Sequence, residues 1–306
     1  MRIKRSAIRP IARTLAKELA FTFALLVGIS VVVYAMLVTA PNSHSADLAT
    51  ARPAEQTATP AYFHWLAGLV QGDLGNTSRS GGLVADELIP AAGHTLCLIA
   101  CAMSASLLVA VPLAVCAATK RFNGLSRPLL ITLYLSSALP SFWLAYAAIF
   151  VSTHYLDYFP VVDGTNIDWP ITALATAILV LGSGLATTAA RELSSELTRV
   201  LSQEYVTAAV AKGASLWRHA YVEGLLLPIL EIAATRLSHV IGACVIVEQV
   251  LNWPGLGRLV WQAAQERDTH LVMGAVLACA LFVALAHLLH RTLHVLMNPR
   301  ASHMGY

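Results

Sequence analysis

Two groups of side chains have types and spacings that suit metal binding. Each group recurs at the spacing of one helical face, and imidazole and thiolate ligands in such an arrangement suit a transition metal such as nickel. The groups are His287, His290 and His294, and His94, Cys97 and Cys101. Residues of these types more often pack in a core or extend toward lipid headgroups. Both interpretations stay open, and no metal site is assigned.

A third group surrounds an arginine that interrupts an apolar stretch. Arg236 shares a helical face with His239 and Ala243. A charge at this depth avoids lipid by facing a cavity or an acidic partner. The three residues are therefore predicted to line a translocation pathway. A structural charge paired with a neighbouring subunit is the alternative.

The sequence lacks the motifs of several enzyme classes. HExxH, GxSxG and paired membrane carboxylates are missing, and so are the nucleotide-binding patterns GxxxxGKS/T and GxGxxG. An intramembrane enzyme and a structural membrane scaffold are kept as alternatives without such support. No catalytic residue and no cofactor bound by this chain is expected.

These residues belong to a chain that is built for a membrane. Of its 306 residues, 57% are hydrophobic and 12% are charged, against about 25% charged in a typical soluble domain. Six apolar runs approach or exceed the roughly 20 residues that span a bilayer as a helix. The runs are residues 19–40, 92–119, 129–153, 171–190, 229–251 and 271–290. They are too long and continuous for barrel strands, so an all-α, polytopic membrane protein with six transmembrane helices is predicted.

The orientation follows from the distribution of Lys and Arg. Fifteen of the 20 lysine and arginine residues fall on the side that holds both termini, four fall on the other side, and Arg236 lies inside a span. Both termini are therefore predicted to be cytoplasmic. The net charge of +3 requires no nucleic-acid partner. All five cysteines lie inside the predicted spans, so a disulfide framework is not supported.

The N-terminal part of the chain leaves two choices open. Basic residues recur at every fourth position within residues 1–18, opposite an apolar stripe, which predicts an amphipathic helix on the inner leaflet. A plain topogenic charge cluster is the alternative. Residues 19–40 form the first span, or the core of a signal peptide with a cleavage site at residues 38–40.

Polar segments connect the spans. Residues 41–91 are predicted as an outer loop with short helices, and residues 252–270 as a further outer loop. On the inner side, residues 191–227 form a long segment and residues 291–306 a tail. The mixed charges of the long inner segment suit a folded pair of polar helices better than a lipid-binding basic tract.

The long inner segment contains an unusual stretch, EYVTAAVAKG, at residues 204–213. On a helix, its alanines leave a low-profile face that another surface can approach closely, and Gly213 is placed to end the helix. Leu227-Pro228 then restarts a helix that re-enters the membrane. The pattern indicates a docking helix. An interfacial helix with no partner is the alternative.

This inner pattern resembles the EAA loop of permease subunits in binding-protein-dependent ABC importers. It is most similar to the dipeptide, oligopeptide and nickel permease branch, and further motifs match that branch in the same order along most of the chain. They are Gly72-Asp73-Leu74-Gly75, Pro140-Ser141-Phe142-Trp143-Leu144-Ala145, Val247-Glu248, Trp253-Pro254-Gly255-Leu256-Gly257, Arg267-Asp268 and Asn298-Pro299-Arg300. The resemblance implies the type I importer permease fold (MetI-like), with its transmembrane domain at residues 92–297, in the bacterial cytoplasmic (inner) membrane.

The resemblance also implies roles for particular residues. A docking helix of this kind would sit in a groove on a cytoplasmic ABC ATPase and transmit its closure to the spans. The residues of this coupling group are Glu204, Tyr205, Ala208, Ala209, Lys212 and Gly213. A second group at the outer end would form a periplasmic gate or contact the receptor, with a purely structural turn as the alternative. It consists of Glu248, Pro254, Gly255 and Gly257.

Partners and a class of solute follow from the same resemblance. The chain would be a non-catalytic permease subunit that pairs with a homologous second permease and receives solute from an extracytoplasmic solute-binding protein. It would depend on ATPase subunits that use ATP and Mg²⁺. Short peptides are the default solute of the branch, and nickel or a metal chelate is the alternative. Both are kept because the first outer loop lacks the Gly-Asp-Pro element of the branch.

Overall fold

Helices make up nearly all of the structure. A computed structural model describes residues 5–39, 58–119, 128, 131–132, 134–135, 137–156, 171–213 and 225–297. Its main helices are α1 (Arg5–Thr39), α2 (Ala58–Val70), α3 (Val84–Ala118), α5 (Ser141–Tyr155), α6 (Ile171–Leu201), α7 (Glu204–Ala211), α9 (Leu227–Val250), α10 (Leu256–Glu266) and α11 (Thr269–Met297). Within these ranges the one extended pairing is an isolated bridge between Asn76 and Leu83. The predicted all-α fold is confirmed for the described part of the chain.

Five helices in the described ranges are long and apolar enough to cross a membrane. The candidate spans are Ala16–Thr39, Val84–Ala118, Ile171–Leu201, Pro228–Val250 and Thr269–Leu293. Each corresponds to one of the predicted spans. The chain is therefore an all-helical, polytopic membrane protein.

The predicted span at residues 129–153 is not confirmed. Pro140 has an extended backbone (φ −59°, ψ 141°) and caps α5, which contains only 15 residues. A helix of this length reaches about 22 Å, less than the roughly 30 Å of the hydrocarbon core. Proline disfavours helix at the residue before it, which interrupts a run that is continuous in hydropathy. Several residues before Pro140 lie outside the described ranges, so the count of six spans stays a prediction.

Four of the long helices, α1, α3, α6 and α11, extend well beyond the predicted boundaries. The segment 5–18, expected as a separate interfacial helix, is continuous with the first span in α1. α3 begins at Val84, and α6 continues to Leu201. The predicted connecting segments 41–91 and 191–227 are shortened accordingly. The physical reason is that hydropathy marks where a helix leaves the lipid, whereas its hydrogen bonds continue into water.

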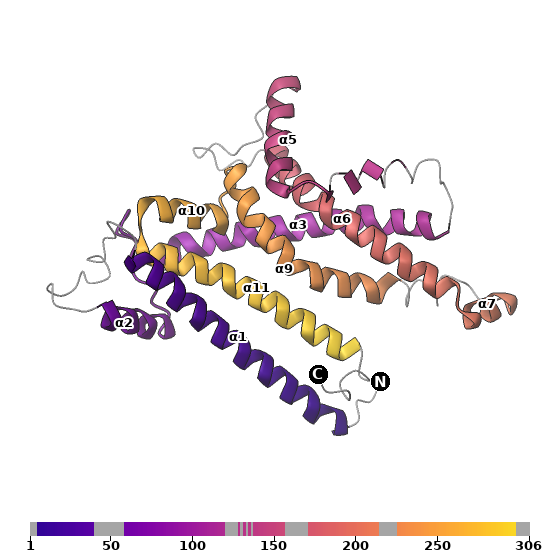
Figure 1. The fold of residues 1–306 in the computed structure, drawn as a ribbon, viewed down its shortest axis with the longest axis horizontal. Coiled ribbons are helices and arrows are strands. Elements are labelled where there is room, and N and C mark those ends of the chain that lie inside the picture. The colour runs from indigo at the N-terminus through magenta and orange to yellow at the C-terminus, as the bar shows by residue number, and fades with distance from the viewer. Residues whose placement is uncertain are drawn as a thin grey trace.

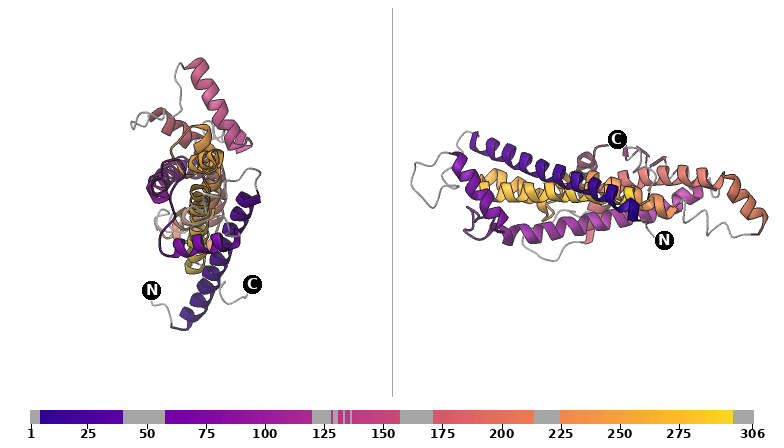
Figure 2. Two further views of the ribbon diagram at one scale, coloured as in Figure 1. Left: turned by 90° about the vertical axis from the view of Figure 1, so that its left-hand side faces the viewer. Right: turned by 90° about the horizontal axis from the view of Figure 1, so that it is seen from below.

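The molecule has two ends that carry different elements. α7 lies at one end, and α2 and α10 lie at the opposite end (Figure 1). The first residues of α1 and the last residues of α11 point toward the α7 end, and a second view agrees (Figure 2). The N-terminal end of α1 and the C-terminal end of α11 therefore lie on the same side of the molecule as α7. That this side is cytoplasmic stays a prediction from the distribution of Lys and Arg.

The core lies where α3, α6 and α9 pack against one another. Ser106 of α3 donates to the carbonyl oxygens of Ala102 (2.5 Å) and of Gly182 in α6 (3.1 Å). A Cβ atom on Gly182 would lie 2.9 Å from the Ser106 hydroxyl, so a larger residue here would have to displace that hydroxyl. Small residues of this kind let membrane helices approach closely. Buried residues around this contact include Leu98, Ile99, Ala177, Leu181, Val240 and Ile241.

A second packing contact fixes α2 against α1 and α11. The hydroxyl groups of Ser30 and Tyr62 share a hydrogen bond of 2.8 Å. Tyr62 packs with Tyr34, Trp65 and Met273 in a small buried cluster. This cluster lies toward the α10 end of the molecule, where aromatic side chains suit the membrane interface.

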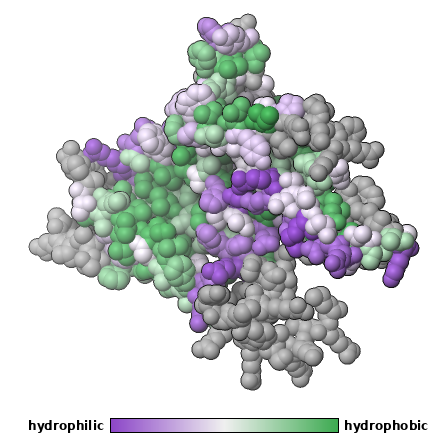
Figure 3. All heavy atoms as spheres, turned by 45° about the vertical axis from the view of Figure 1, so that its right-hand side comes forward, coloured by the Kyte–Doolittle hydropathy of each residue, from purple (hydrophilic) through white to green (hydrophobic). Residues whose placement is uncertain are grey.

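The outer surface is divided between hydrophobic and hydrophilic areas. Figure 3 shows hydrophobic side chains over the left part and the top of one face, and hydrophilic side chains from its centre toward the right. Exposed large hydrophobic residues lie on the spans themselves, among them Phe21, Phe23, Leu96, Leu108, Leu179 and Leu281. So many exposed apolar side chains on long helices indicate contact with lipid.

Candidate functional site

α7 stands at the tip of α6, at one end of the molecule (Figure 1). α6 ends at Leu201 and α7 begins at Glu204. In the turn between them, the amide of Gln203 donates to the carbonyl of Val200 (3.1 Å) and the amide of Thr207 donates to the carbonyl of Gln203 (3.2 Å). These bonds join the last turn of α6 to the first turn of α7, so the two helices form one connected arm.

α7 packs on this arm through Val206 and exposes most of its remaining surface. Val206 is 4% exposed and contacts Val200 of α6. Of the predicted coupling residues, Ala209 is half-buried and the others are exposed, namely Glu204, Tyr205, Ala208, Lys212 and Gly213. Gly213 has φ 77°, the left-handed conformation in which glycine ends a helix. Residues 214–224, where a further helix was expected, lie outside the described residues.

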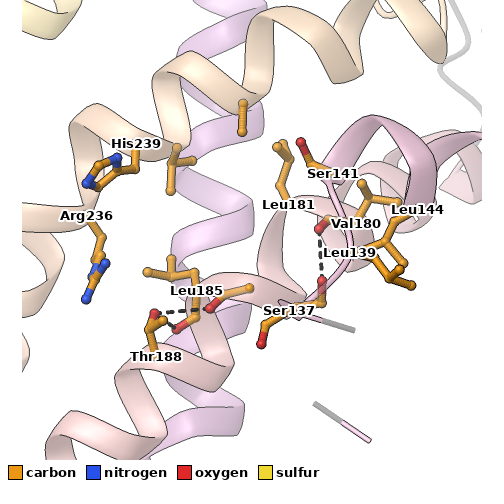
Figure 4. Close-up of a pocket in the computed structure, with 14 residues that line it drawn as sticks. Ser137, Leu139, Ser141, Leu144, Val180, Leu181, Leu185, Thr188, Arg236 and His239 are labelled. Atoms are coloured by element: carbon orange, nitrogen blue, oxygen red, sulfur yellow. Dashed lines mark hydrogen bonds between the residues drawn. The ribbon is translucent and has the colours of Figure 1, made fainter. Parts of the chain in front are cut away.

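The three residues predicted to line a pathway lie at a single cavity. Arg236, His239 and Ala243 of α9 line a cavity of about 190 Å³ between α5, α6 and α9. Figure 4 shows Arg236 and His239 on one side of it and residues that include Ser137 and Ser141 on the other. The rest of the wall combines apolar side chains with hydroxyl groups. The hydroxyl residues are Ser137, Ser141, Ser183 and Thr188.

Arg236 forms an ion pair with Glu192 of α6. The two side chains are 27% and 36% exposed, so the pair is not sealed inside the protein. The Nε atom of Arg236 is buried and, among the described residues, has no hydrogen-bond partner. Within this chain the acidic partner is Glu192, and a pair with a neighbouring subunit stays an alternative. Sequence reasoning missed Glu192 because it lies just beyond the predicted span, although it follows Thr188 by one helical turn.

Glu248, near the other end of α9, is 0% exposed. Its Oε1 atom accepts hydrogen bonds from the Thr95 hydroxyl (2.6 Å) and the Cys244 thiol (3.3 Å), and its Oε2 atom accepts one from the Gly257 amide (2.7 Å). Thr95 Oγ1 in turn accepts from the Leu256 amide (2.8 Å). We refer to Glu248, Thr95, Leu256 and Gly257 as the outer clasp. It ties α3, α9 and the start of α10 together.

Two glycines allow the turn of the outer clasp to fold over Glu248. A Cβ atom on Gly255 would lie 2.2 Å from a carboxylate oxygen of Glu248, and one on Gly257 would lie 2.4 Å from the Cα of Val245. Glu248, Gly255 and Gly257 are all buried, so in this conformation they cannot touch a receptor directly. Pro254 is half-buried. The receptor-contact prediction is corrected for the three buried residues, and a gating role stays a prediction.

A second cavity, of about 280 Å³, lies beside the outer clasp. Its wall includes Asp86 and Glu87 of α3 and Arg258 of α10. Arg258 donates to the carbonyl of Asn252 (2.9 Å). Burial, together with the nearby charge of Arg79, lowers the pKa of the Arg258 guanidinium. These residues were not singled out from the sequence, because no motif links the first turn of α3 to a helix so distant in the chain.

The histidine and cysteine groups that suited a metal have other contacts. His94 Nδ1 lies 2.8 Å from the carbonyl oxygen of Pro254, and His290 Nδ1 lies 3.2 Å from the hydroxyl of Thr235. The side chain of His294 is outside the described residues. In the part of the chain that the structure describes, no group of three or more His, Cys, Asp or Glu side chains is arranged to hold a metal ion.

Known proteins resemble this chain over most of its length. Residues 110–303 match the family described as "Binding-protein-dependent transport system inner membrane component". The oligopeptide transport system permease protein AppB of Bacillus subtilis is 30% identical over 249 residues, which cover 78% of this chain and 79% of the relative. The dipeptide transport system permease protein DppB of Escherichia coli K12 is 31% identical over 275 residues, or 79% and 80%. The glutathione transport system permease protein GsiC of Escherichia coli O6:H1 is 30% identical over 242 residues, or 78% of each chain.

The family match covers more than half of the chain and includes the Arg236 cavity, α7 and the α9 side of the outer clasp. Permeases of this family are transport subunits that lack ATPase activity of their own, and they work in systems that also contain ATPase and binding-protein components. The long apolar helices agree with a multi-pass position in the inner membrane. The chain therefore belongs to the family of binding-protein-dependent transport system inner membrane components, as a permease subunit of an ABC importer.

Proposed function

We propose that this permease imports short peptides, that it forms half of the pathway with a homologous second permease, and that α7 docks on a cytoplasmic ABC ATPase. The ATPase subunits use ATP and Mg²⁺, and an extracytoplasmic solute-binding protein delivers the peptide. The observation that carries the proposal is the continuity of α6. One helix of 31 residues runs from the cavity wall to the turn before α7.

A force applied to α7 reaches the cavity through this one helix. Thr188 lines the cavity and Leu201 ends α6. The stretch between them measures about 20 Å at 1.5 Å per residue. Backbone hydrogen bonds keep a helix of this length nearly straight, so a tilt at one end displaces the other. ATP-driven movement of α7 would thus open and close the cavity, as alternating access requires.

The exposed surface of α7 suits a docking partner. Ala208 and Ala211 are exposed and small, so a groove on another protein can approach the helix backbone closely. Glu204, Tyr205 and Lys212 surround them with groups that can form polar contacts at the rim. Val206 packs α7 against α6, so a force that a partner applies to α7 is passed on to α6.

Peptides are the solute with the most support. The three relatives described above are named for oligopeptide, dipeptide and glutathione transport. The cavity wall of this chain combines hydroxyl groups with apolar side chains, which suits amide groups and peptide side chains together. Nickel or a metal chelate is the alternative solute. It has less support because the described residues that line the cavity include no Asp, Glu or Cys.

The docking step is tested with Ala208→Trp and Ala211→Trp in the complete importer. Each indole enlarges the outer face of α7 without reaching the buried Val206. We expect the ATPase subunits to separate from the permease during purification and peptide uptake to fall at least tenfold. Ala264→Trp in α10 is the matched control, because Ala264 is also exposed but lies at the opposite end of the molecule. Gly213 is a poorer test site, since its positive φ would strain any other residue.

Two results would contradict the proposal. If both tryptophan variants kept the ATPase and imported peptide at the wild-type rate, α7 would not be the docking element. If the wild-type importer moved Ni²⁺ and no peptide, the solute would be wrong while the docking assignment could stand. Uptake of labelled dipeptide and of radioactive nickel into proteoliposomes distinguishes these cases.

A further inference from the structure

We infer that Arg236 binds a carboxylate group of the imported peptide, and that during transport it exchanges this partner for Glu192. The inference rests on the proposed function, because it names the group that recognises the solute in the same cavity. Three observations support it. They are the charge of the cavity wall, the hydrogen-bond donors and acceptors on that wall, and the position of Glu192 on α6.

The cavity wall has a single permanent charge. Among the described residues that line it, Arg236 is the one charged group, His239 is the one other titratable group, and Asp and Glu are missing. In the described conformation Glu192 neutralises Arg236. The wall becomes cationic, and attracts an anion rather than a metal cation, when that pair opens. A guanidinium also holds a carboxylate through two parallel hydrogen bonds. The wall therefore favours a solute with a free carboxylate over a bare divalent cation.

Three of the four hydroxyl groups on the wall present acceptors rather than donors. Ser183, Thr188 and Ser137 donate to nearby backbone carbonyls at 3.1, 3.0 and 2.9 Å. Their protons are engaged, so each oxygen offers lone pairs to the cavity. Peptide N–H groups can donate to these oxygens while the terminal carboxylate accepts from Arg236. A peptide with a free C-terminus matches both kinds of group.

The pairing of Arg236 with Glu192 leaves the buried Nε donor unused. The Nη2 atom donates to Glu192, whereas Nε is buried without a partner among the described residues. Because Nε is buried, a solute carboxylate reaches Nε and an Nη atom side by side only after the Arg236 side chain moves. A buried N–H without an acceptor is unfavourable, so a second arrangement that satisfies it is readily reached. The geometry thus provides two alternative partners for one guanidinium.

Glu192 lies on the arm that leads to α7. It follows the cavity residue Thr188 by one turn of α6, and Arg236 belongs to α9. Any displacement of α6 relative to α9 changes the separation of the two charges. When α6 moves away, Arg236 is available to the solute. When α6 returns, Glu192 competes with the solute carboxylate and promotes its release.

The experiment compares uptake of alanyl-phenylalanine with uptake of its C-terminal amide by the complete importer in proteoliposomes. Each peptide is supplied at a concentration that saturates the solute-binding protein, and saturation is measured separately. The ratio of the two rates then reports on the permease. We expect the wild type to import the acid at least ten times faster than the amide. Arg236→Gln should bring the ratio close to one, and Arg236→Lys should give an intermediate value because lysine binds without the two-pronged geometry.

Exchanging the charges of Arg236 and Glu192 distinguishes a role of Arg236 in binding the solute from a role in holding α6 and α9 together. The double variant Arg236→Glu with Glu192→Arg keeps an ion pair between α6 and α9 but places a carboxylate at the cavity. We expect assembly with the ATPase, measured by co-purification, to be retained, and uptake of the acid to be lost. Arg291→Gln is the matched control. It removes an Arg–Glu pair between α11 and α1 (3.5 Å) outside the cavity and should leave the ratio unchanged.

Wild-type uptake of the acid by the charge-exchanged importer would overturn the inference. An acid-to-amide ratio for Arg236→Gln equal to that of the wild type would do the same. In both cases the wild type still imports peptide, so the proposed function stands. If the assembled wild-type importer took up neither peptide, the proposed function would fail and the inference with it.

Discussion

Two of the three charged residues of α9, Glu248 and Arg236, have surroundings that differ sharply. Glu248 and Arg236 are about 18 Å apart along the same helix at 1.5 Å per residue. Glu248 is 0% exposed and accepts hydrogen bonds from Thr95, Cys244 and Gly257. Arg236 is 27% exposed, lines a cavity, and keeps a buried Nε without a partner in the described structure.

This difference separates a structural charge from an available one. A buried carboxylate with a full set of donors resists movement, because any displacement leaves buried polar groups unsatisfied. A guanidinium that lies beside a cavity and keeps its Nε donor unused can change partners at lower cost. We therefore expect substitutions at the outer clasp to lower stability, and substitutions at the Arg236–Glu192 pair to alter transport.

The largest effect is expected from Gly257→Ala. The added Cβ would lie 2.4 Å from the Cα of Val245 and 2.5 Å from its carbonyl oxygen, so the backbones of α9 and α10 must separate. Overpacking against backbone costs about 3 kcal/mol or more. We expect a much lower thermal unfolding midpoint for the permease in detergent, or no folded protein. Gly242→Ala in α9, whose Cβ meets nothing within 4 Å, should match the wild type. Equal midpoints for the two variants would mean that the clasp is loosely packed.

Glu248→Ala is expected to have the next largest effect. It leaves the Thr95 hydroxyl and the Gly257 amide without their acceptor in a buried site, at a cost of about 2 kcal/mol. The matched control is Glu266→Ala, which removes an exposed ion pair with Arg79 (3.1 Å) and should change stability by less than about 0.5 kcal/mol. Thermal unfolding of both variants measures the difference. Similar losses at Glu248 and Glu266 would remove the contrast on which the comparison depends.

Thr95→Val should destabilise the outer clasp at a second residue of its hydrogen-bond network, with a smaller effect than Glu248→Ala. The substitution keeps the shape of the side chain but removes the hydroxyl that donates to Glu248 and accepts from Leu256. We expect a loss of about 1 to 1.5 kcal/mol, again from the unfolding midpoint. Thr153→Val in α5 is the control, because its exposed hydroxyl bonds only within its own helix. A wild-type midpoint for Thr95→Val would show that the hydroxyl contributes nothing to the clasp.

The smallest change in stability is expected at the Arg236–Glu192 pair, although its effect on transport should be large. Arg236→Gln with Glu192→Gln removes both charges of a half-exposed pair, so the free energy of unfolding should change by less than about 1 kcal/mol. Uptake of a peptide with a free carboxylate should nevertheless fall at least tenfold. Stability and uptake are measured on the same preparation. A loss of stability as large as that of Glu248→Ala would identify the pair as structural.

Features that depend on neighbours along the chain were predictable. Helical periodicity placed Arg236, His239 and Ala243 on one face, and the structure brings all three to one cavity. The alanine-rich stretch ended by Gly213 forms the expected helix, with the positive φ that glycine supplies. Five of the six predicted spans correspond to long apolar helices. The span at 129–153 is not confirmed, and hydropathy does not register the break at Pro140.

Partners far apart in the chain were not predictable. Glu192 lies 44 residues from Arg236, and Thr95 lies 153 residues from Glu248. No local pattern relates such residues, because their contact depends on how α3, α6 and α9 cross. The same limitation affected Glu248. The motif placed Glu248 at the outer end of the fifth predicted span. Only the tertiary packing revealed that Gly255 and Gly257 lie against Glu248 and bury it.

The sequence by itself indicated a helical membrane protein of the importer permease family with an alanine-rich helix after residue 203. Hydropathy, helical spacing and ordered motifs are local properties, so they can be recognised in the sequence without knowledge of the fold. Only the tertiary structure decided which charge is sealed and which is available. That distinction depends on the donors and acceptors that other helices bring within about 3 Å of each charge, and close packing of distant segments sets those distances.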